Sequence, residues 1–146
     1  MSTESTRPEP PVTSPSVIVL TLARRLEAEL NAALAPLDLT VARLALLGHV
    51  ASLPGASFSE LARMGGVTVQ SVHTGIRALQ SAGLVRDLTA RAGSASEIEL
   101  TPRGSDLLDR AREVIGAVDE KMFGPEAEPV PREIARTIRG AFPGDG

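Results

Sequence analysis

One predicted helix in this chain carries a face of hydrogen-bonding side chains, which are candidate contacts to double-stranded DNA. These residues are Thr68, Gln70, Ser71, His73, Thr74 and Arg77. A glutamine amide can pair with adenine through two hydrogen bonds, and Arg77, near the middle of the helix, can reach a guanine or a phosphate. Every surface helix also has a solvated polar face, so that interpretation stays open beside the first.

The other face of the same helix is apolar. Val72, Ile76 and Leu79 cluster at helical spacing and are expected to face a core. Gly65-Gly66 breaks the short helix that precedes it, and Gly83 is expected to end it as the first residue beyond the cap. A helix, a tight turn with glycine and a second helix form the helix-turn-helix order.

Two strand-like runs follow this helix, at Leu84–Leu88 and Ser96–Leu100, and predict a small β-wing. Arg91 is the one basic residue in the loop between them. An arginine in a wing can enter the minor groove, where narrow A·T tracts concentrate negative potential. An ordinary solvated loop arginine is the alternative. Arg86 and Arg63 are further candidates for contacts to phosphates.

Other segments must position this reading head. Met1–Pro15 is rich in Ser, Thr and Pro and is expected to be a disordered tail. The residue type and position of helix N-caps are found at Thr40, Ser57, Thr68 and Thr101, and Ser57 has Glu60 at capping-box spacing. The further helices that we expect are Ser16–Ala35, Val41–Ser52, a short one after Ser57, a long one from Thr101-Pro102 to Gly124-Pro125, and Pro131–Phe142.

The expected fold is mainly α with a small β-wing. A winged helix-turn-helix lobe would span residues 37–101, with dimerisation helices at residues 16–36 and 102–146. Three apolar-striped arm helices are more than one small lobe can cover, which indicates a partner chain.

Composition excludes several kinds of chemistry. The chain has 146 residues and a formal charge of −3, with no Cys, Trp or Tyr. Residues 57–103 hold five arginines against four acids, so the acid excess lies outside the predicted reading head. The two histidines, His49 and His73, fall on different helices with no carboxylate at ligand spacing. We expect no metal site, no cofactor and no catalytic residues.

The longest apolar run near the N-terminus is Val17–Leu20, followed closely by Arg24 and Arg25. It is too short for a membrane span or a signal core. We expect a cytoplasmic protein without a membrane partner.

Several motifs in this order resemble the MarR family of bacterial transcriptional regulators. The most specific are Gly83-Leu84-Val85 at the end of the recognition helix and Leu100–Gly104 at the start of the next one. Weaker agreements are Leu39-Thr40, Phe58–Ala62, and Ser71-Val72 with Leu79. The similarity covers about residues 16–122, more loosely continuing through the last helix.

The resemblance implies a homodimer that binds a palindromic operator, most often as a repressor. It also implies a small, often aromatic, effector between the dimer helices and the DNA-binding lobe. His49 lies beside that implied cavity, so it is a candidate effector contact, and a partly buried structural histidine is the alternative.

The chain departs from the family pattern at its contact residues. The family often has an arginine at the position of Thr74 and an acid at that of Arg77, and its wing loop is more basic. Fewer phosphate contacts predict a shallower salt dependence. The alternative function is therefore a MarR-like dimer that has lost operator binding and serves as a small-molecule-binding or protein-interaction module.

Overall fold

The computed structural model describes residues 14–88 and 97–144. The elements in chain order are α1 (Pro15–Leu34), the single 3-10 turn η1 (Ala35–Leu37), α2 (Val41–Ser52), α3 (Phe58–Gly65), α4 (Val69–Ser81), β1 (Val85–Asp87), β2 (Ile98–Leu100), α5 (Pro102–Phe123) and α6 (Pro129–Ala141). This mainly α fold with one two-stranded antiparallel sheet confirms the predicted fold class.

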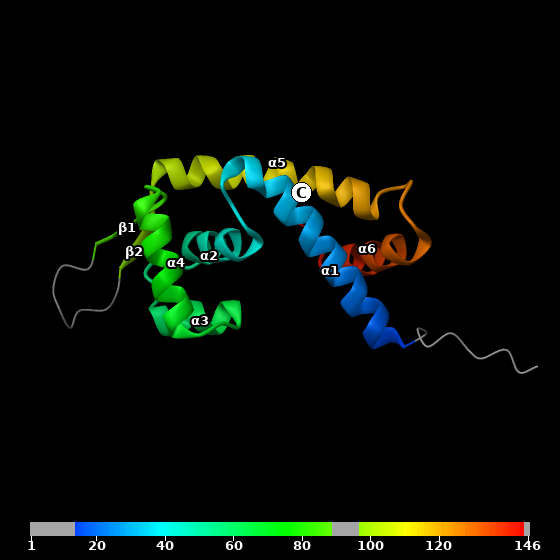
Figure 1. The fold of residues 1–146 in the computed structure, drawn as a ribbon, viewed down its shortest axis with the longest axis horizontal. Helices are drawn as coiled ribbons and strands as arrows, with labels where there is room; N and C mark the ends of the chain where they lie inside the picture. The colour runs from blue at the N-terminus through cyan, green and yellow to red at the C-terminus, as the bar shows by residue number, and fades with distance from the viewer. Residues whose placement is uncertain (1–13, 89–96, 145–146) are drawn as a thin grey trace, which may run out of the picture.

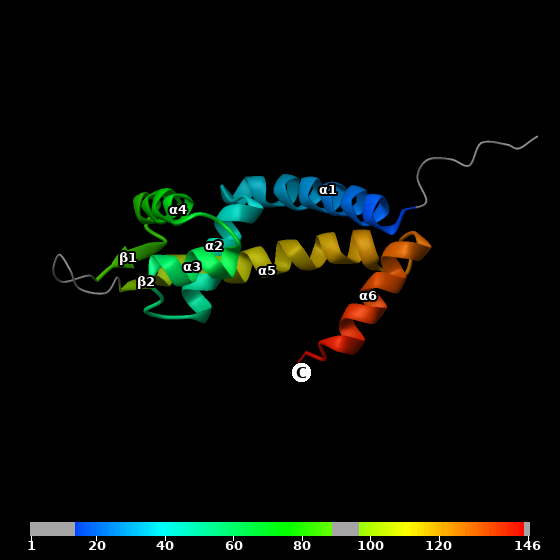
Figure 2. The ribbon, with the colours of Figure 1, turned by 90° about the horizontal axis from the view of Figure 1, so that it is seen from below.

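The molecule is elongated. Helices α2, α3 and α4 and the two strands gather at one end, while α1 and α6 extend toward the other (Figure 1). Helix α5 runs from the wing along the length of the molecule, and α1 packs against it, alongside it in Figure 2 and slanting away from it in Figure 1. Helix α6 packs against the far end of α5. Helix α5 is therefore the element that joins the lobe to the arms.

Side-chain caps start the lobe helices where the sequence predicts them. Thr40 Oγ1 accepts a hydrogen bond from the Arg43 amide at 3.2 Å. Ser57 and Glu60 form a complete capping box, in which each side chain accepts from the other residue's amide. These caps satisfy amides that have no partner within their own helix.

Glycines with positive φ end α3 and α4. Gly66 has φ 62° and Gly83 has φ 73°. The Gly83 amide bonds to the Gln80 carbonyl, and the Leu84 amide bonds to that of Leu79. This pair of bonds is a Schellman motif, which confirms the predicted role of Gly83. Because the motif uses the Leu84 amide, β1 begins at Val85 rather than at Leu84.

Other predicted boundaries differ by one or two residues: β2 begins at Ile98 rather than Ser96, and α1, β1 and α6 each end one residue earlier than predicted, at Leu34, Asp87 and Ala141. Helix α6 starts at Pro129, two residues before the predicted Pro131, because the first turn of a helix tolerates proline at more than one position. Pro15 is the first residue of α1 rather than the last of a tail. Residues 1–13 of the predicted tail lie outside the described residues.

The core of the lobe is aliphatic. Val72, Ile76 and Leu79 of α4 are each at most 2% exposed, as their spacing predicts. They pack in one cluster with Leu47 of α2 and Leu61 of α3. Burial of these side chains fixes which face of α4 points outward.

The arm helices keep large apolar side chains on their surface. In α1 these are Val17, Ile18, Val19 and Leu20, and in α6 they are Val130 and Ile138; Phe142, directly after α6, is 77% exposed. Taken singly, no helix within the described ranges is both long and apolar enough to cross a membrane; α1 with η1 and α2 reach that criterion only as a pair bent by 74°.

Candidate nucleic-acid interface

Four of the predicted contact residues line one shallow hollow on the exposed face of α4. The hollow has a volume of about 220 Å³ and is lined by Gln70, His73, Thr74 and Arg77. All four are exposed. The Thr74 hydroxyl donates to the Gln70 carbonyl at 3.1 Å, which leaves its oxygen as an acceptor for an incoming amino group. Arg77 forms no ion pair with any of the described residues, so its guanidinium is available to an anion.

The other two predicted contacts on this helix are separated from the hollow. Thr68 Oγ1 accepts from the Ser71 amide at 3.0 Å and donates to Ser71 Oγ at 2.9 Å. Thr68 is thereby committed to capping the helix. Ser71 lies on the flank, where it lines a different cavity.

His73 is held by an aromatic partner that the sequence analysis did not single out. The Phe58 ring, at the start of α3, lies edge-on to the imidazole with ring centroids 4.1 Å apart. Such edge-to-face pairs stabilise one relative orientation of two rings. Phe58 therefore positions a side chain of the reading face from the neighbouring helix. The sequence did offer a signal for this contact: the chain has only three Phe and no Trp or Tyr, and Phe58 falls within the helix-turn-helix.

The back of α4 approaches α2 very closely. A Cβ built at Gly75 would lie 2.5 Å from Leu46 Cδ2. Any side chain at position 75 would therefore require the end of the Leu46 side chain to move. Glycine at this position lets the two helices pack with Leu46 where it lies.

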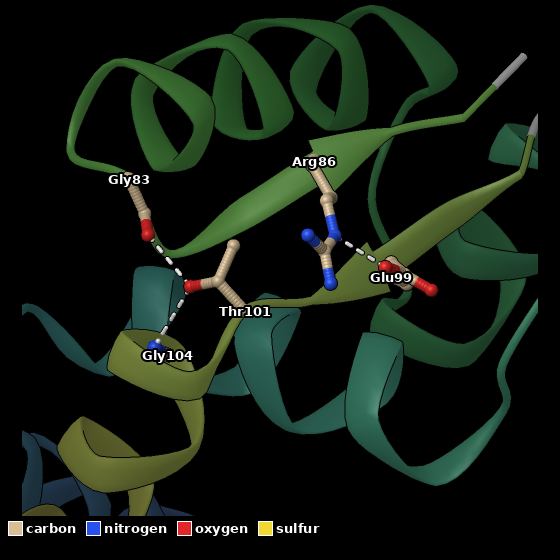
Figure 3. Close-up of polar contacts among 5 residues, drawn as sticks. All are labelled: Gly83, Arg86, Glu99, Thr101 and Gly104. Carbon is tan, nitrogen blue, oxygen red and sulfur yellow. Dashed lines mark hydrogen bonds and ion pairs between the residues drawn. The ribbon is translucent and has the colours of Figure 1, made fainter.

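The wing is partly neutralised at its base. Arg86 of β1 forms an ion pair with Glu99, its cross-strand partner in the antiparallel register (Figure 3). This exposed pairing engages Nε of Arg86 and offsets its charge, so less positive charge is left at the wing base for a phosphate. Arg91, the predicted minor-groove contact, lies outside the described residues.

A polar latch, formed by Gly83, Leu84, Thr101 and Gly104, fastens the end of α4 to the start of α5. The Thr101 hydroxyl donates to the Gly83 carbonyl at 2.6 Å and accepts from the Gly104 amide at 3.1 Å (Figure 3). The Thr101 amide also donates to the Leu84 carbonyl at 3.0 Å. A Cβ at Gly104 would lie 2.2 Å from that carbonyl oxygen, so only glycine permits this approach.

His49 lies in a cavity of about 370 Å³ on the side of α4 away from the hollow. This back cavity has apolar walls from α2, α3 and α4, and its polar rim consists of Glu27, Arg43, His49 and Ser71. His49 is half-buried and sits against the helix-turn-helix, 3.8 Å from where a Cβ on Gly65 would be. Its position fits both interpretations from the sequence, a ligand contact and a structural histidine. Across the described part of the chain, no three His, Cys, Asp or Glu side chains gather as a metal site would require.

Comparison with known proteins identifies a family of similar proteins. A family model described as the MarR family matches residues 37–92. The transcriptional repressor Rv2887 of Mycobacterium tuberculosis, a protein of the helix-turn-helix type, is 37% identical over 114 residues, which are 77% of this chain and 82% of that protein.

Solved structures of Rv2887 share the fold. The complex of Rv2887 with DNA superposes with a TM-score of 0.70 at 32% identity, covering 88% of this chain and 97% of that one. The complex with salicylic acid gives a TM-score of 0.68 at 32% identity, covering 88% and 96%. The family model, the identity to the repressor and the shared fold agree, and this chain belongs to the MarR family.

Proposed function

We propose that this chain is a ligand-responsive transcriptional repressor that binds a palindromic DNA operator as a homodimer. The observation that carries the proposal is the hollow on α4, where Gln70, His73, Thr74 and Arg77 stand together on a face fixed by the buried back of the helix. These side chains supply hydrogen-bond donors, acceptors and one positive charge on a single helix, and the major groove of DNA is wide enough to admit one helix. The DNA complex of the related Rv2887 supports the same role.

The dimer is proposed from the arms. Seven large apolar side chains, on α1, on α6 and directly after α6, are between 39% and 77% exposed in the single chain. An apolar surface of that kind on two neighbouring helices marks an interaction site, and a second copy would cover it symmetrically. We assign residues 16–36 and 102–146 to dimerisation and residues 37–101 to DNA binding. Sedimentation that gives the mass of a monomer at micromolar concentration would refute this assignment.

The effector is proposed to bind in the back cavity, lined by His49. Rv2887 has been crystallised with salicylic acid and with p-aminosalicylic acid, which are small aromatic acids. The same cavity is lined by Ser71, Val72 and Gly75, so an occupant touches the back of the recognition helix. A ligand that binds better to one placement of α4 than to another lowers DNA affinity by that difference. Because an operator is reached inside the cell, we propose that the protein is cytoplasmic. We also propose that it has no catalytic role.

The test is selection of genomic DNA fragments on the purified protein, followed by fluorescence anisotropy on the selected site. Arg77→Ala is expected to weaken binding to the selected site by about tenfold to a hundredfold and to relax its base preference. Arg112→Ala, which removes an α5 arginine that pairs with Asp109, is the matched control and is expected to bind as the parent does. Equal affinities of the parent and Arg77→Ala would refute the placement of the reading face.

One observation favours a second function. The wing-base cation Arg86 is paired with Glu99, and the chain as a whole carries a formal charge of −3. A MarR-like dimer whose wing base offers so little free positive charge could bind a small molecule or a protein without binding an operator. Recovery of no enriched fragment in the selection, together with saturable binding of salicylic acid, would establish this alternative.

A further inference from the structure

We propose that Phe58 is a positioning residue for operator recognition, which presents the His73 imidazole to a hydrogen-bond acceptor on the DNA, either a purine N7 or a phosphate oxygen. Phe58 lies on α3, outside the recognition helix. Its ring stands edge-on to the imidazole, with ring centroids 4.1 Å apart and the ring planes at 65°. His73 is one of the four residues that line the hollow on the exposed face of α4. The inference rests on the DNA binding proposed above and extends the reading head to a second helix.

Phe58 is itself held by the lobe. Its side chain is half-buried and packs against the buried core cluster. It is the first residue of α3, directly after the N-cap Ser57, whose capping box with Glu60 fixes the start of the helix. An edge-to-face pair favours one relative orientation of its two rings. The orientation of His73 is therefore set by α3 and the core as well as by its own helix.

The polar atoms of the His73 imidazole remain available to a ligand. The side chain is exposed, and within residues 14–88 and 97–144 it forms no hydrogen bond or ion pair. A neutral imidazole donates from one ring nitrogen, and a protonated one donates from both. Phosphate oxygens and the N7 atoms of purines in the major groove accept such bonds. The contact with Phe58 thus orients the imidazole and leaves its donor free for DNA.

Support from another helix distinguishes His73 from the other residues of the hollow. The Thr74 hydroxyl bonds to its own helix. In the described part of the chain, the side chains of Gln70 and Arg77 form no hydrogen bond, ion pair or ring contact. A side chain that becomes ordered only on binding loses rotamer freedom, which lowers affinity by about twofold to tenfold. Because His73 is ordered before DNA binds, loss of the Phe58 ring is expected to weaken operator binding by that factor for each subunit bound.

A double-mutant cycle tests the role of Phe58. Affinity for the selected operator is measured by fluorescence anisotropy for the parent, Phe58→Leu, His73→Ala and the double variant. Phe58→Leu is expected to weaken binding in the parent background and to have no further effect where His73 is already replaced. Equal weakening in the two backgrounds would show a structural role only and would overturn the proposal. No weakening in the parent background would overturn it as well.

Two further variants protect the cycle from effects on folding. Met64→Leu changes an exposed apolar side chain near the other end of α3, so it is the matched control and is expected to bind as the parent does. Phe58→Met keeps an apolar side chain of similar length without a ring, and it repeats the cycle if Phe58→Leu is unstable. Urea denaturation shows whether each variant is folded in the binding buffer. A parent chain that selects no DNA would refute the proposed function and this inference together, whereas a parent that binds, with a cycle showing no coupling, refutes the role of Phe58 alone.

Modified operators locate the acceptor. A 7-deazapurine, placed at one position at a time, removes a purine N7, and a methylphosphonate linkage replaces one phosphate oxygen by a methyl group. A modification that weakens binding of the parent but not of His73→Ala identifies the atom that the imidazole contacts. A deazapurine position assigns that atom to a base edge and a methylphosphonate position assigns it to the backbone, and either result supports the proposal. Equal effects of every modification on the parent and on His73→Ala would show that the imidazole contacts neither, and would overturn it.

Discussion

The Thr101 hydroxyl donates a hydrogen bond of 2.6 Å to the Gly83 carbonyl, and this bond joins the end of the recognition helix to the start of the longest helix. The same oxygen caps α5 by accepting from the Gly104 amide. The Thr101 side chain thus lies at the end of the wing and also fastens the wing to the start of α5. Thr101 is therefore a direct link between the start of α5 and the end of α4.

Removal of that hydroxyl is expected to cost more than a cap alone. Thr101→Val keeps the shape of the side chain but loses both the cap and the bond to Gly83, and we expect a loss of about 1–2 kcal/mol in the free energy of unfolding. Urea denaturation measures it. Thr137→Val, which removes an exposed bond to the Glu133 carbonyl within α6, is the matched control and is expected to change stability by less than about 0.5 kcal/mol. Similar losses in both variants would contradict a special role for Thr101.

The close approach at Gly104 predicts a position that accepts no side chain. Gly104→Ala would place a Cβ 2.2 Å from the Leu84 carbonyl oxygen, so backbone must shift, and we expect a loss of about 1–3 kcal/mol. Gly48→Ala is the matched helical control because its Cβ meets no atom within 4 Å. That variant is expected to gain up to about 1 kcal/mol from helix propensity. A Gly104→Ala chain as stable as Gly48→Ala would show that the wing and α5 are not tightly joined.

The ion pair at the base of the wing predicts a gain of function. Glu99→Gln releases Arg86, which can then contact a phosphate and release one more counterion. The slope of log affinity for DNA against log salt is expected to steepen by about 0.9. Glu133→Gln changes the net charge equally by releasing Arg136 on α6, far from the reading face, and is expected to leave the slope unchanged. Parallel salt slopes for all three proteins would show that Arg86 does not reach the DNA.

The capping box of α3 predicts a pH dependence of stability. The Ser57 amide and then the Ser57 hydroxyl, through their hydrogen bonds, hold the pKa of Glu60 below its ordinary value of 4.5, and nearby Arg63 lowers it further. Because the folded-state pKa is the lower one, this contribution to stability is complete above the unfolded pKa and is lost as pH falls through the folded pKa. The stability difference between the parent and Glu60→Gln is therefore expected to shrink in acid. Urea denaturation between about pH 3 and pH 7 measures it, and a constant difference would contradict the assignment.

Local signals predicted much of this fold. Thr40, Ser57, Thr68 and Thr101 cap helices where their residue types and spacing place them, because a cap depends only on the three or four residues that follow. Gly83 ends α4 for the same local reason. The buried stripe of α4 follows from helical periodicity, which also fixed the outward face that holds the hollow.

Contacts between distant segments were not predicted. The edge-on packing of Phe58 on His73 depends on how α3 crosses α4, and no spacing within either helix encodes that angle. The pairing of Arg86 with Glu99 depends on strand register, which the loop between them sets.

The close packing of Gly75 on Leu46 separates two faces of the recognition helix: an exposed face whose residues can be exchanged and a packed face that constrains substitution. A protein engineer who wished to retarget this lobe to another sequence could rewrite the residues at positions 70, 73, 74 and 77 together, since all four side chains are exposed. Position 75 would be kept as glycine or changed together with Leu46, whose side-chain end lies where a Cβ would go. The packing of Gly75 on Leu46, behind the reading face, therefore limits which residues such a redesign can use.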